Sequence, residues 1–208
     1  MAEAERGAQG QMNMIFWQAP STLNLYLSTG TKDITAASLV LEPLANFDAK
    51  GDLVAKLAAE IPTLENGGVA QDSKSITWKL KDGVKWSDGT PLTAEDVKFT
   101  ADYCMDESGG CAQAAKFTGI ASVEVVDPLT VKINFTEARP YPYSAFVGGQ
   151  APIIQKAQFQ DCTGERAPTC TQQNFGPIGT GPPNSSPRRG RSRTRRCCRP
   201  RPGCRPSG

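Results

Sequence analysis

The chain has 208 residues, with 23 basic side chains, 21 acidic side chains and no histidine. Without histidine the commonest general base and the usual imidazole ligand of zinc are missing, so we expect no enzymatic activity, no cofactor and no metal site. No apolar run approaches the ~18–20 residues that a membrane-spanning helix needs, so no membrane segment is expected.

Charge is distributed unevenly along the chain. Residues 184–208 contain nine arginines and no acidic or large apolar side chain, so residues 1–183 hold 14 basic against 21 acidic residues, a net charge of −7. We expect the body to be a globular protein with an acidic surface and the Arg/Pro-rich tail to be disordered. Two interpretations of the tail stay open: an arm that binds nucleic acid or another acidic partner, and a segment foreign to the fold.

The first elements are a strand and a helix. The opening "MAEAERGAQGQ" has no hydrophobic segment, so residues 1–10 are expected to be disordered and no secretory signal is expected. Residues 11–18 ("QMNMIFWQ") alternate with apolar side chains on both faces, which predicts a strand buried within a sheet. A polar loop follows, and Ile34, Ala37 and Leu41 then have the spacing of one helix face.

The clearest local patterns lie in the middle of the chain. Residues 76–80 alternate between apolar and polar side chains and predict a half-buried strand. Two Asp-Gly turns follow, and Thr93 with Asp96 three residues later predicts a capping box at the start of a helix. Trp78 and Trp86 are expected in the core.

A hairpin and an aromatic loop are predicted next. Alternating apolar residues on both sides of "VDPLT" indicate two antiparallel strands within residues 123–135. In the following "RPYPYSAF", we expect Tyr141, Tyr143 and Phe146 to take part in aromatic packing between lobes of the fold rather than in ligand contacts. A short helix is expected near Ala145.

Four of the seven cysteines form two short-range pairs. Cys104/Cys111 and Cys162/Cys170 each enclose a Gly-containing loop, which suits two disulfides in an exported protein. Four unrelated buried thiols are the alternative. A zinc site is less favoured because neither pair has Cys-x-x-Cys spacing and no histidine assists.

Five sequence blocks together resemble a known family. In chain order they are "FWQAPSTLNLYLSTGT", "LVLEPLANFDAKGDLVAKLAAEIP", "ITWKLKDGVKWSDGTPLTAEDVKFTADY", "IASVEVVDPLTVKINFTEARPYPYSAFV" and "GPIGTGP". They resemble the family 5 extracellular solute-binding proteins, the peptide- and nickel-type binding components of ABC importers. The resemblance covers about residues 11–182.

The resemblance implies a mixed α/β (α+β) fold, a fragment of a class II periplasmic-binding-protein-like clamp. Residues 11–41 would supply the first strand and loop of ligand-binding lobe I, and residues 42–174 an extra mixed α/β domain. Residues 175–183 would re-enter lobe I, and the second lobe is missing, because family members are more than twice as long. No internal repeat is found.

The resemblance also bears on the tail. The family pattern places an aromatic residue after Gly-Thr-Gly-Pro, whereas Pro183 stands there in this chain. Arg, Pro, Gly, Ser and Cys are the residues that GC-rich DNA encodes when it is read out of frame. We therefore expect residues 184–208 to be a non-family, frameshifted tail, and we expect no nucleic acid partner.

The implied function is that of the substrate-binding component of an ABC importer. Such a protein captures peptides or similar solutes outside the cytoplasmic membrane, in the periplasm or extracellular space, and delivers them to the permease. Contact with the membrane would come only through the permease. The truncation implies that this chain clamps its ligand poorly.

Ligand contacts in this family come partly from the loop after the first strand. The resemblance places this loop at seven positions of the present chain. Those positions are Trp17, Gln18, Ala19, Pro20, Thr22, Leu23 and Asn24. The alternative is that Trp17 and Leu23 are core residues. An extended segment can also pair with a peptide through its backbone alone, which demands no particular side chains.

Overall fold

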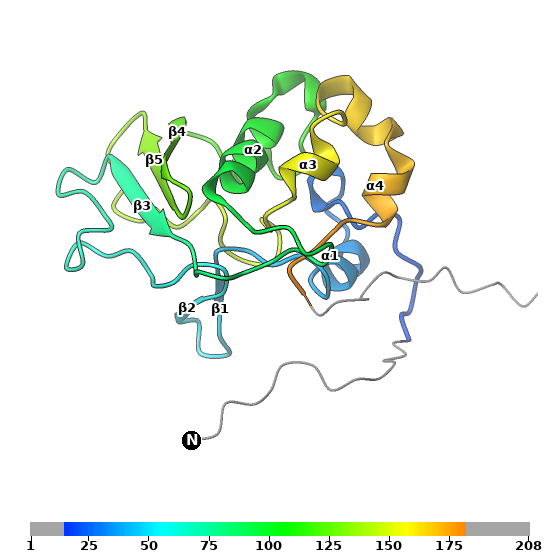
Figure 1. The fold of residues 1–208 in the computed structure, drawn as a ribbon, viewed down its shortest axis with the longest axis horizontal. Coiled ribbons are helices and arrows are strands. Elements are labelled where there is room, and N and C mark those ends of the chain that lie inside the picture. The colour runs from blue at the N-terminus through cyan, green and yellow to red at the C-terminus, as the bar shows by residue number, and fades with distance from the viewer. Residues whose placement is uncertain (1–14, 182–208) are drawn as a thin grey trace, which may run out of the picture.

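The computed structural model describes residues 15–181, which form two antiparallel sheets and a group of short helices beside one longer helix (Figure 1). The larger sheet has the strand order β3 (Ser75–Lys79), β5 (Thr130–Phe135), β4 (Ile120–Asp127). A separate hairpin consists of β1 (Ala45–Phe47) and β2 (Leu53–Ala55). The predicted strand at residues 76–80 and the predicted hairpin are confirmed.

The helices lie on one side of the larger sheet. The longest, α2 (Ala94–Met105), contacts β4 and β5, and the short helix α3 (Lys156–Phe159) contacts α2 in turn. The remaining elements are α1 (Thr31–Ala37), α4 (Thr171–Phe175) and the 3₁₀ turns η1 (Leu25–Leu27), η2 (Glu107–Gly109), η3 (Ala114–Lys116) and η4 (Gly164–Thr169). Helix α1 contains Ile34 and Ala37 of the predicted helix face but ends at Ala37, before Leu41, the third residue of that face.

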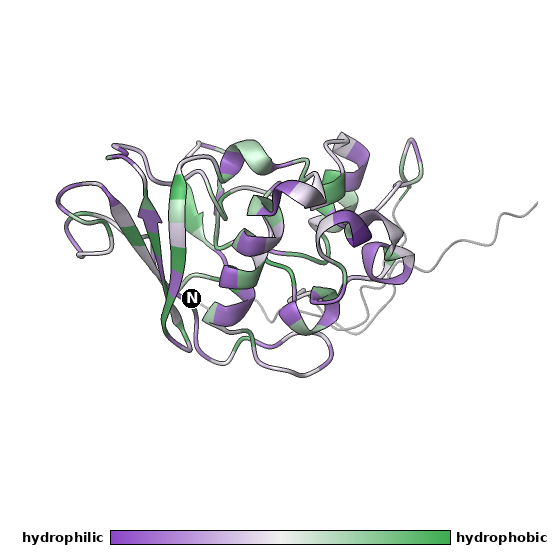
Figure 2. Cartoon of the chain, turned by 90° about the horizontal axis from the view of Figure 1, so that it is seen from above, coloured by the Kyte–Doolittle hydropathy of each residue, from purple (hydrophilic) through white to green (hydrophobic). Residues whose placement is uncertain are grey.

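The period-two pattern of the larger sheet explains how it packs. Ile76 pairs with Ile133 and Trp78 with Val131, and these four side chains are at most 1% exposed. The residues between them are polar and less buried, so one face of the sheet is apolar and the other is polar. The helices likewise carry both hydrophobic and hydrophilic residues along their length (Figure 2). Sheet and helices therefore share one core.

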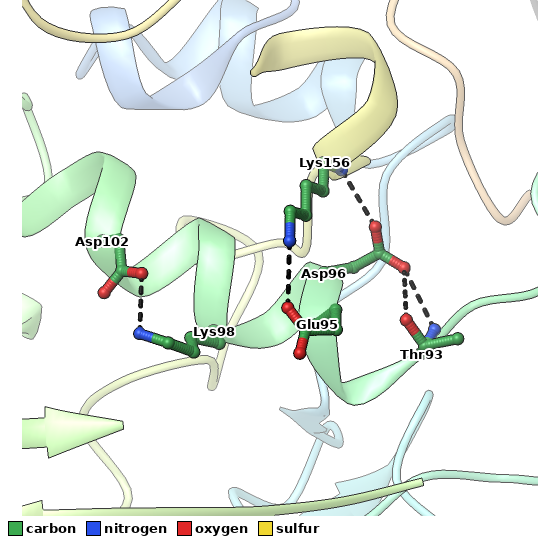
Figure 3. Close-up of polar contacts among 6 residues, drawn as sticks. All are labelled: Thr93, Glu95, Asp96, Lys98, Asp102 and Lys156. Carbon is green, nitrogen blue, oxygen red and sulfur yellow. Dashed lines mark hydrogen bonds and ion pairs between the residues drawn. The ribbon is translucent and has the colours of Figure 1, made fainter. Parts of the chain in front are cut away.

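The carboxylate of Asp96 joins three parts of the fold at the start of α2 (Figure 3). Its Oδ2 accepts from the backbone N–H of Thr93 at 3.0 Å and from the indole N–H of Trp86 at 3.3 Å. Its Oδ1 accepts from the backbone N–H of Lys156, the first residue of α3, at 2.9 Å. The predicted capping box is thus confirmed, and its acid also fixes α3 on α2.

The buried residues form one large core and one small core. The large core contains both predicted tryptophans, Trp78 and Trp86, together with Tyr26 from the N-terminal part of the chain. The small core is formed by Leu23, Leu25, Ala36 and Ala37. The segment before α1 therefore contributes to both cores. The domain limits at residues 41/42 and 174/175 stay a prediction.

The "GPIGTGP" block returns to the N-terminal part of the chain. The carbonyl of Gly179 accepts from the N–H of Ser87 at 2.8 Å, and the N–H of Gly181 donates to the carbonyl of Val40 at 3.3 Å. A Cβ atom at Gly179 would overlap the Val40 carbonyl. The close approach of the two backbones is therefore possible because residue 179 is glycine.

Two local predictions are wrong. Residues 15–18 form no strand, with Ile15 fully exposed and Trp17 79% exposed, since no strand of the described chain lies beside them to accept their backbone hydrogen bonds. No helix begins near Ala145. The chain turns there, with Phe146 at φ 59°. The Phe146 carbonyl accepts from the N–H of Leu44 at 2.9 Å, so it is bonded to the segment before β1 and not within a helix.

Several predictions concern residues outside the described range. These are the disorder of residues 1–10, the first part of the predicted strand, and the nature of the tail at residues 184–208. Among residues 15–181, no helix is both long and apolar enough to cross a membrane.

Replacing Asp96 with alanine should lower the free energy of unfolding by about 2–4 kcal/mol, because the donors of Thr93, Trp86 and Lys156 lose their common acceptor in a buried site. Glu95→Ala is the matched control. It removes an exposed ion pair with Lys156 and should cost less than about 1 kcal/mol. Urea denaturation followed by circular dichroism measures both, and equal losses would contradict the role assigned to Asp96.

Candidate functional site

The structure divides the seven predicted ligand contacts into an exposed part and a buried part. Residues 17–20 lie at or near the surface, and Trp17 is 79% exposed. Residues 22–24 are buried, and Leu23 belongs to the small core. Leu23 is thus a core residue, as the alternative interpretation predicted, and Trp17 is not. Residues 17–20 are the part of the segment that a ligand can reach.

Asn24 is fully buried and satisfies its polar groups within the chain. Its side-chain N–H₂ group donates to the Tyr103 hydroxyl at 3.0 Å and to Oδ1 of Asn174 at 2.9 Å. Its Oδ1 accepts from the backbone N–H of Tyr26 at 3.1 Å, and its own N–H donates to the Thr22 hydroxyl at 3.0 Å. The arrangement gives Asn24 a structural role, with no donor left over for a ligand.

The start of α1 holds the exposed part of the segment. Oδ1 of Asp33 accepts from the N–H of Ser21 at 2.6 Å, and Oδ2 accepts from the hydroxyl of Ser28 at 2.6 Å. The ammonium group of Lys32 donates to the carbonyl of Ala19 at 3.2 Å and to the Ser21 hydroxyl. Asp33 is only 1% exposed. Residues 19–21 are therefore fixed on α1 by two charged side chains.

The sequence did not indicate that Lys32 and Asp33 hold the preceding loop. An acidic residue in the first turn of a helix is ordinary, because it faces the positive end of the helix dipole. Nothing in the pattern "TGTKDI" shows that Asp33 turns back to Ser21, 12 residues earlier. Only the fold of the preceding loop brings them together.

Aromatic side chains surround the buried part of the segment. Tyr26 packs against Tyr103 and Phe117, with ring centroids 6.0 and 6.1 Å apart, and its hydroxyl donates to the Pro152 carbonyl. Burial raises the pKa of Tyr26 well above its usual value, and the neighbouring Tyr103 adds to this effect. Burial also raises the pKa of Tyr103, against a smaller opposite effect of the hydrogen bond from Asn24. Both hydroxyls therefore stay neutral at physiological pH.

The aromatic residues of the 138–147 loop pack against other aromatic side chains, and their expected place between two lobes stays a prediction. Tyr141 and Tyr143 meet edge to face at 5.1 Å, and Tyr143 meets Trp78 at 6.4 Å. The Tyr143 hydroxyl donates to the Pro62 carbonyl at 2.6 Å, while Phe146 packs on Phe117. These contacts are structural, and none of them involves residues 17–24.

The four body cysteines lie in two disulfides. Cys104 is joined to Cys111 and Cys162 to Cys170, with Cα–Cα distances of 5.1 and 5.9 Å. Within residues 15–181 there is no group of three or more His, Cys, Asp or Glu side chains that could hold a metal ion. Two surface hollows, one near Pro62 and Lys79 and one near Pro91 and Leu129, do not border residues 17–24.

Comparison with protein families identifies the chain. The family model described as "Bacterial extracellular solute-binding proteins, family 5 Middle" matches residues 52–182. The chain belongs to this family. The resemblance found in the five sequence blocks is confirmed, and the fold class with it.

The curated relatives include glutathione-binding proteins. The glutathione-binding protein GsiB of Shigella flexneri is 29% identical over 167 residues, which are 78% of this chain and 29% of the relative. GsiB of Escherichia coli K12 matches with the same identity and coverage. The chain therefore spans about three tenths of the length of these relatives.

Solved structures show the same partial match. The structure of AgaA from A. tumefaciens R10 in complex with agropinic acid has 25% identity and a TM-score of 0.66, over 79% of this chain and 30% of AgaA. NikZ from Campylobacter jejuni, in complex with Ni(L-His), has 25% identity and a TM-score of 0.65, over 79% and 30%. The oligopeptide-binding protein AppA of Bacillus subtilis has 22% identity and a TM-score of 0.68, over 78% and 31%, and supports the fold.

The exposure of Trp17 can be measured in solution. Trp78 and Trp86 are 0% and 3% exposed, so iodide should quench only the emission of Trp17. The Trp17→Phe variant should lose nearly all iodide quenching, whereas Tyr141→Phe, which alters another exposed aromatic residue, should keep it. Stern–Volmer titration of the three proteins gives the result. Equal quenching in the native chain and in Trp17→Phe would show that Trp17 is buried.

Proposed function

We propose that this chain is part of the substrate-binding component of an ABC importer. It captures a peptide or similar small solute outside the cytoplasmic membrane, in the periplasm or extracellular space, and passes it to the permease. It carries out no catalysis, and its contact with the membrane is through the permease. Membership of the family 5 solute-binding proteins is the observation that carries this proposal.

Residues 17–20 are proposed as the ligand contacts that this chain contributes. Three observations support them: they follow the resemblance to the family's ligand loop, they are accessible, and Lys32 and Asp33 fix the backbone just behind them. An exposed indole suits a peptide or another partly apolar solute, because the ring offers apolar area to the ligand. Fixing the loop beforehand lowers the entropy lost on binding.

The affinity of this chain is proposed to be low. Ligand sites that bury most of a small molecule need walls on several sides. This chain spans about 30% of the matched structures, and residues 17–20 present one accessible surface. We therefore expect dissociation constants in the millimolar range, which corresponds to about 4 kcal/mol of binding free energy.

Titration with two probes tests the proposal. S-methylglutathione, which has no free thiol to exchange with the two disulfides, and a nonapeptide are added separately, up to about ten times the expected millimolar dissociation constant. Trp17 emission and its quenching by iodide are followed. At least one probe should protect Trp17 from iodide. The control Tyr141→Phe should respond as the native chain does. If neither probe changes the emission or the quenching of Trp17, its proposed role in ligand binding is wrong.

A further inference from the structure

The two disulfide-closed loops form a single unit. We call residues 104–111 and 162–170 the paired loops. They meet at two glycines: a Cβ atom added to Gly109 would lie 3.6 Å from the Cα atom of Gly164. Gly164 has a φ of 57°, which a side chain would strain, and it lies against Ser108 of the other loop. The two loops therefore pack directly against each other at these glycines.

The first of the paired loops reaches the N-terminal segment through the residues that follow Cys111. The N–H of Ala112 donates to the carbonyl of Tyr26 at 2.8 Å. The side-chain amide of Gln113 donates to the carbonyls of Ser28 at 3.1 Å and Leu25 at 3.4 Å, and Gln113 is itself only 6% exposed. This loop thus holds η1 through three backbone carbonyls.

The second of the paired loops reaches the same segment through Asn174. The Asn174 carbonyl accepts from the N–H of Leu23 at 2.8 Å and from the Thr22 hydroxyl at 3.1 Å, and its Oδ1 accepts from Asn24. Its side-chain N–H₂ group donates back to the Ala167 carbonyl, inside the disulfide-closed loop, at 2.8 Å. Figure 1 shows the N-terminal segment beside α4, in agreement with these bonds.

Covalent closure is what makes these attachments firm. The elements that carry them are short and directly follow the closed loops: Asn174 lies in α4, which has five residues and follows Cys170, and Gln113 precedes η3, which has three residues and follows Cys111. Helices of this length have almost no stability of their own, because the conformational entropy lost in forming the first turn exceeds the free energy gained from its hydrogen bonds. Each disulfide limits the conformations of the loop from which the following short helix starts, whether or not that helix is intrinsically stable.

We propose that the two disulfides act as a clamp that holds residues 22–28, and through them the exposed residues 17–20, in one fixed position. Gln113 and Asn174 are the positioning residues of this clamp. The importance of the clamp for ligand capture rests on the proposed function, but the clamp itself is a property of the unliganded chain. Its loss would free the segment while leaving the larger sheet intact.

Hydrogen exchange on the full chain without ligand tests the clamp. In the Cys162→Ser/Cys170→Ser double variant, the amides of residues 22–28 should exchange about tenfold faster or more, because they open locally. The amides of residues 131–134, in the middle of the larger sheet, should exchange at the native rate. A role in general stability alone would accelerate both groups equally, and that result would overturn the proposal.

Two single variants complete the experiment. Asn174→Ala keeps both disulfides and should accelerate residues 22–28 in the same way. Gln172→Ala, at an exposed position of the same helix, should change neither group. If the Cys162→Ser/Cys170→Ser variant does not fold, the Cys104→Ser/Cys111→Ser variant takes its place: local acceleration in residues 22–28 supports the clamp, and native exchange there overturns it.

The hydrogen-exchange experiment and the ligand titration can fail independently of each other. A chain that binds neither S-methylglutathione nor the nonapeptide, yet shows local acceleration in the variants, keeps the clamp and loses the proposed ligand contacts. A chain that protects Trp17 on ligand addition, but shows no local acceleration, keeps the ligand contacts and loses the clamp.

Discussion

The side-chain amide of Asn24 is fully buried, so each of its polar atoms must find a partner inside the protein. Those partners are the hydroxyl of Tyr103, Oδ1 of Asn174 and the N–H of Tyr26. Tyr103 belongs to α2 and Asn174 to α4, so one amide joins the N-terminal segment to the longest helix and to the last. Leaving any of these groups unpaired costs about 1–3 kcal/mol, which makes the arrangement of the three segments specific.

The position of the exposed residues depends on this buried junction. Residues 22–24 are pinned from inside by Asn24 and Asn174, and residues 19–21 are pinned from α1 by Lys32 and Asp33. The exposed Trp17 thus lies two residues before a stretch, residues 19–24, that is bonded to the body of the protein. A solute-binding protein benefits from such a loop, because a contact residue held in place loses less entropy when the ligand arrives. Asp96 plays a similar part elsewhere, because its carboxylate accepts hydrogen bonds at the start of α2 and at the start of α3 and so joins the two helices.

The sequence predicted the elements whose causes are local. The alternation at residues 76–80, the hairpin around Pro128 and the capping box of Thr93 and Asp96 depend on residues within about ten positions of each other, and the structure contains all three. The Asn24 junction could not be found in this way, because its partners lie 79 and 150 residues further along the chain. The strand predicted at residues 11–18 fails in its described part for the opposite reason: its apolar alternation is local, but a strand also needs a neighbour. Family membership could be recognised from the sequence because five blocks keep the family's order. The ligand contacts stay a prediction. No motif shows that residues 17–20 are accessible whereas residues 22–24 are buried.

Asn24 and Asn174 are coupled, so that one pair of side-chain amides joins the N-terminal segment to α4. A double-mutant cycle on the free energy of unfolding measures this coupling directly, with Asn24→Ala, Asn174→Ala and the double variant compared with the native chain in urea. We predict a coupling energy above about 1 kcal/mol, because the two side chains share a buried hydrogen bond at 2.9 Å. Additive losses, with a coupling below about 0.3 kcal/mol, would contradict the account.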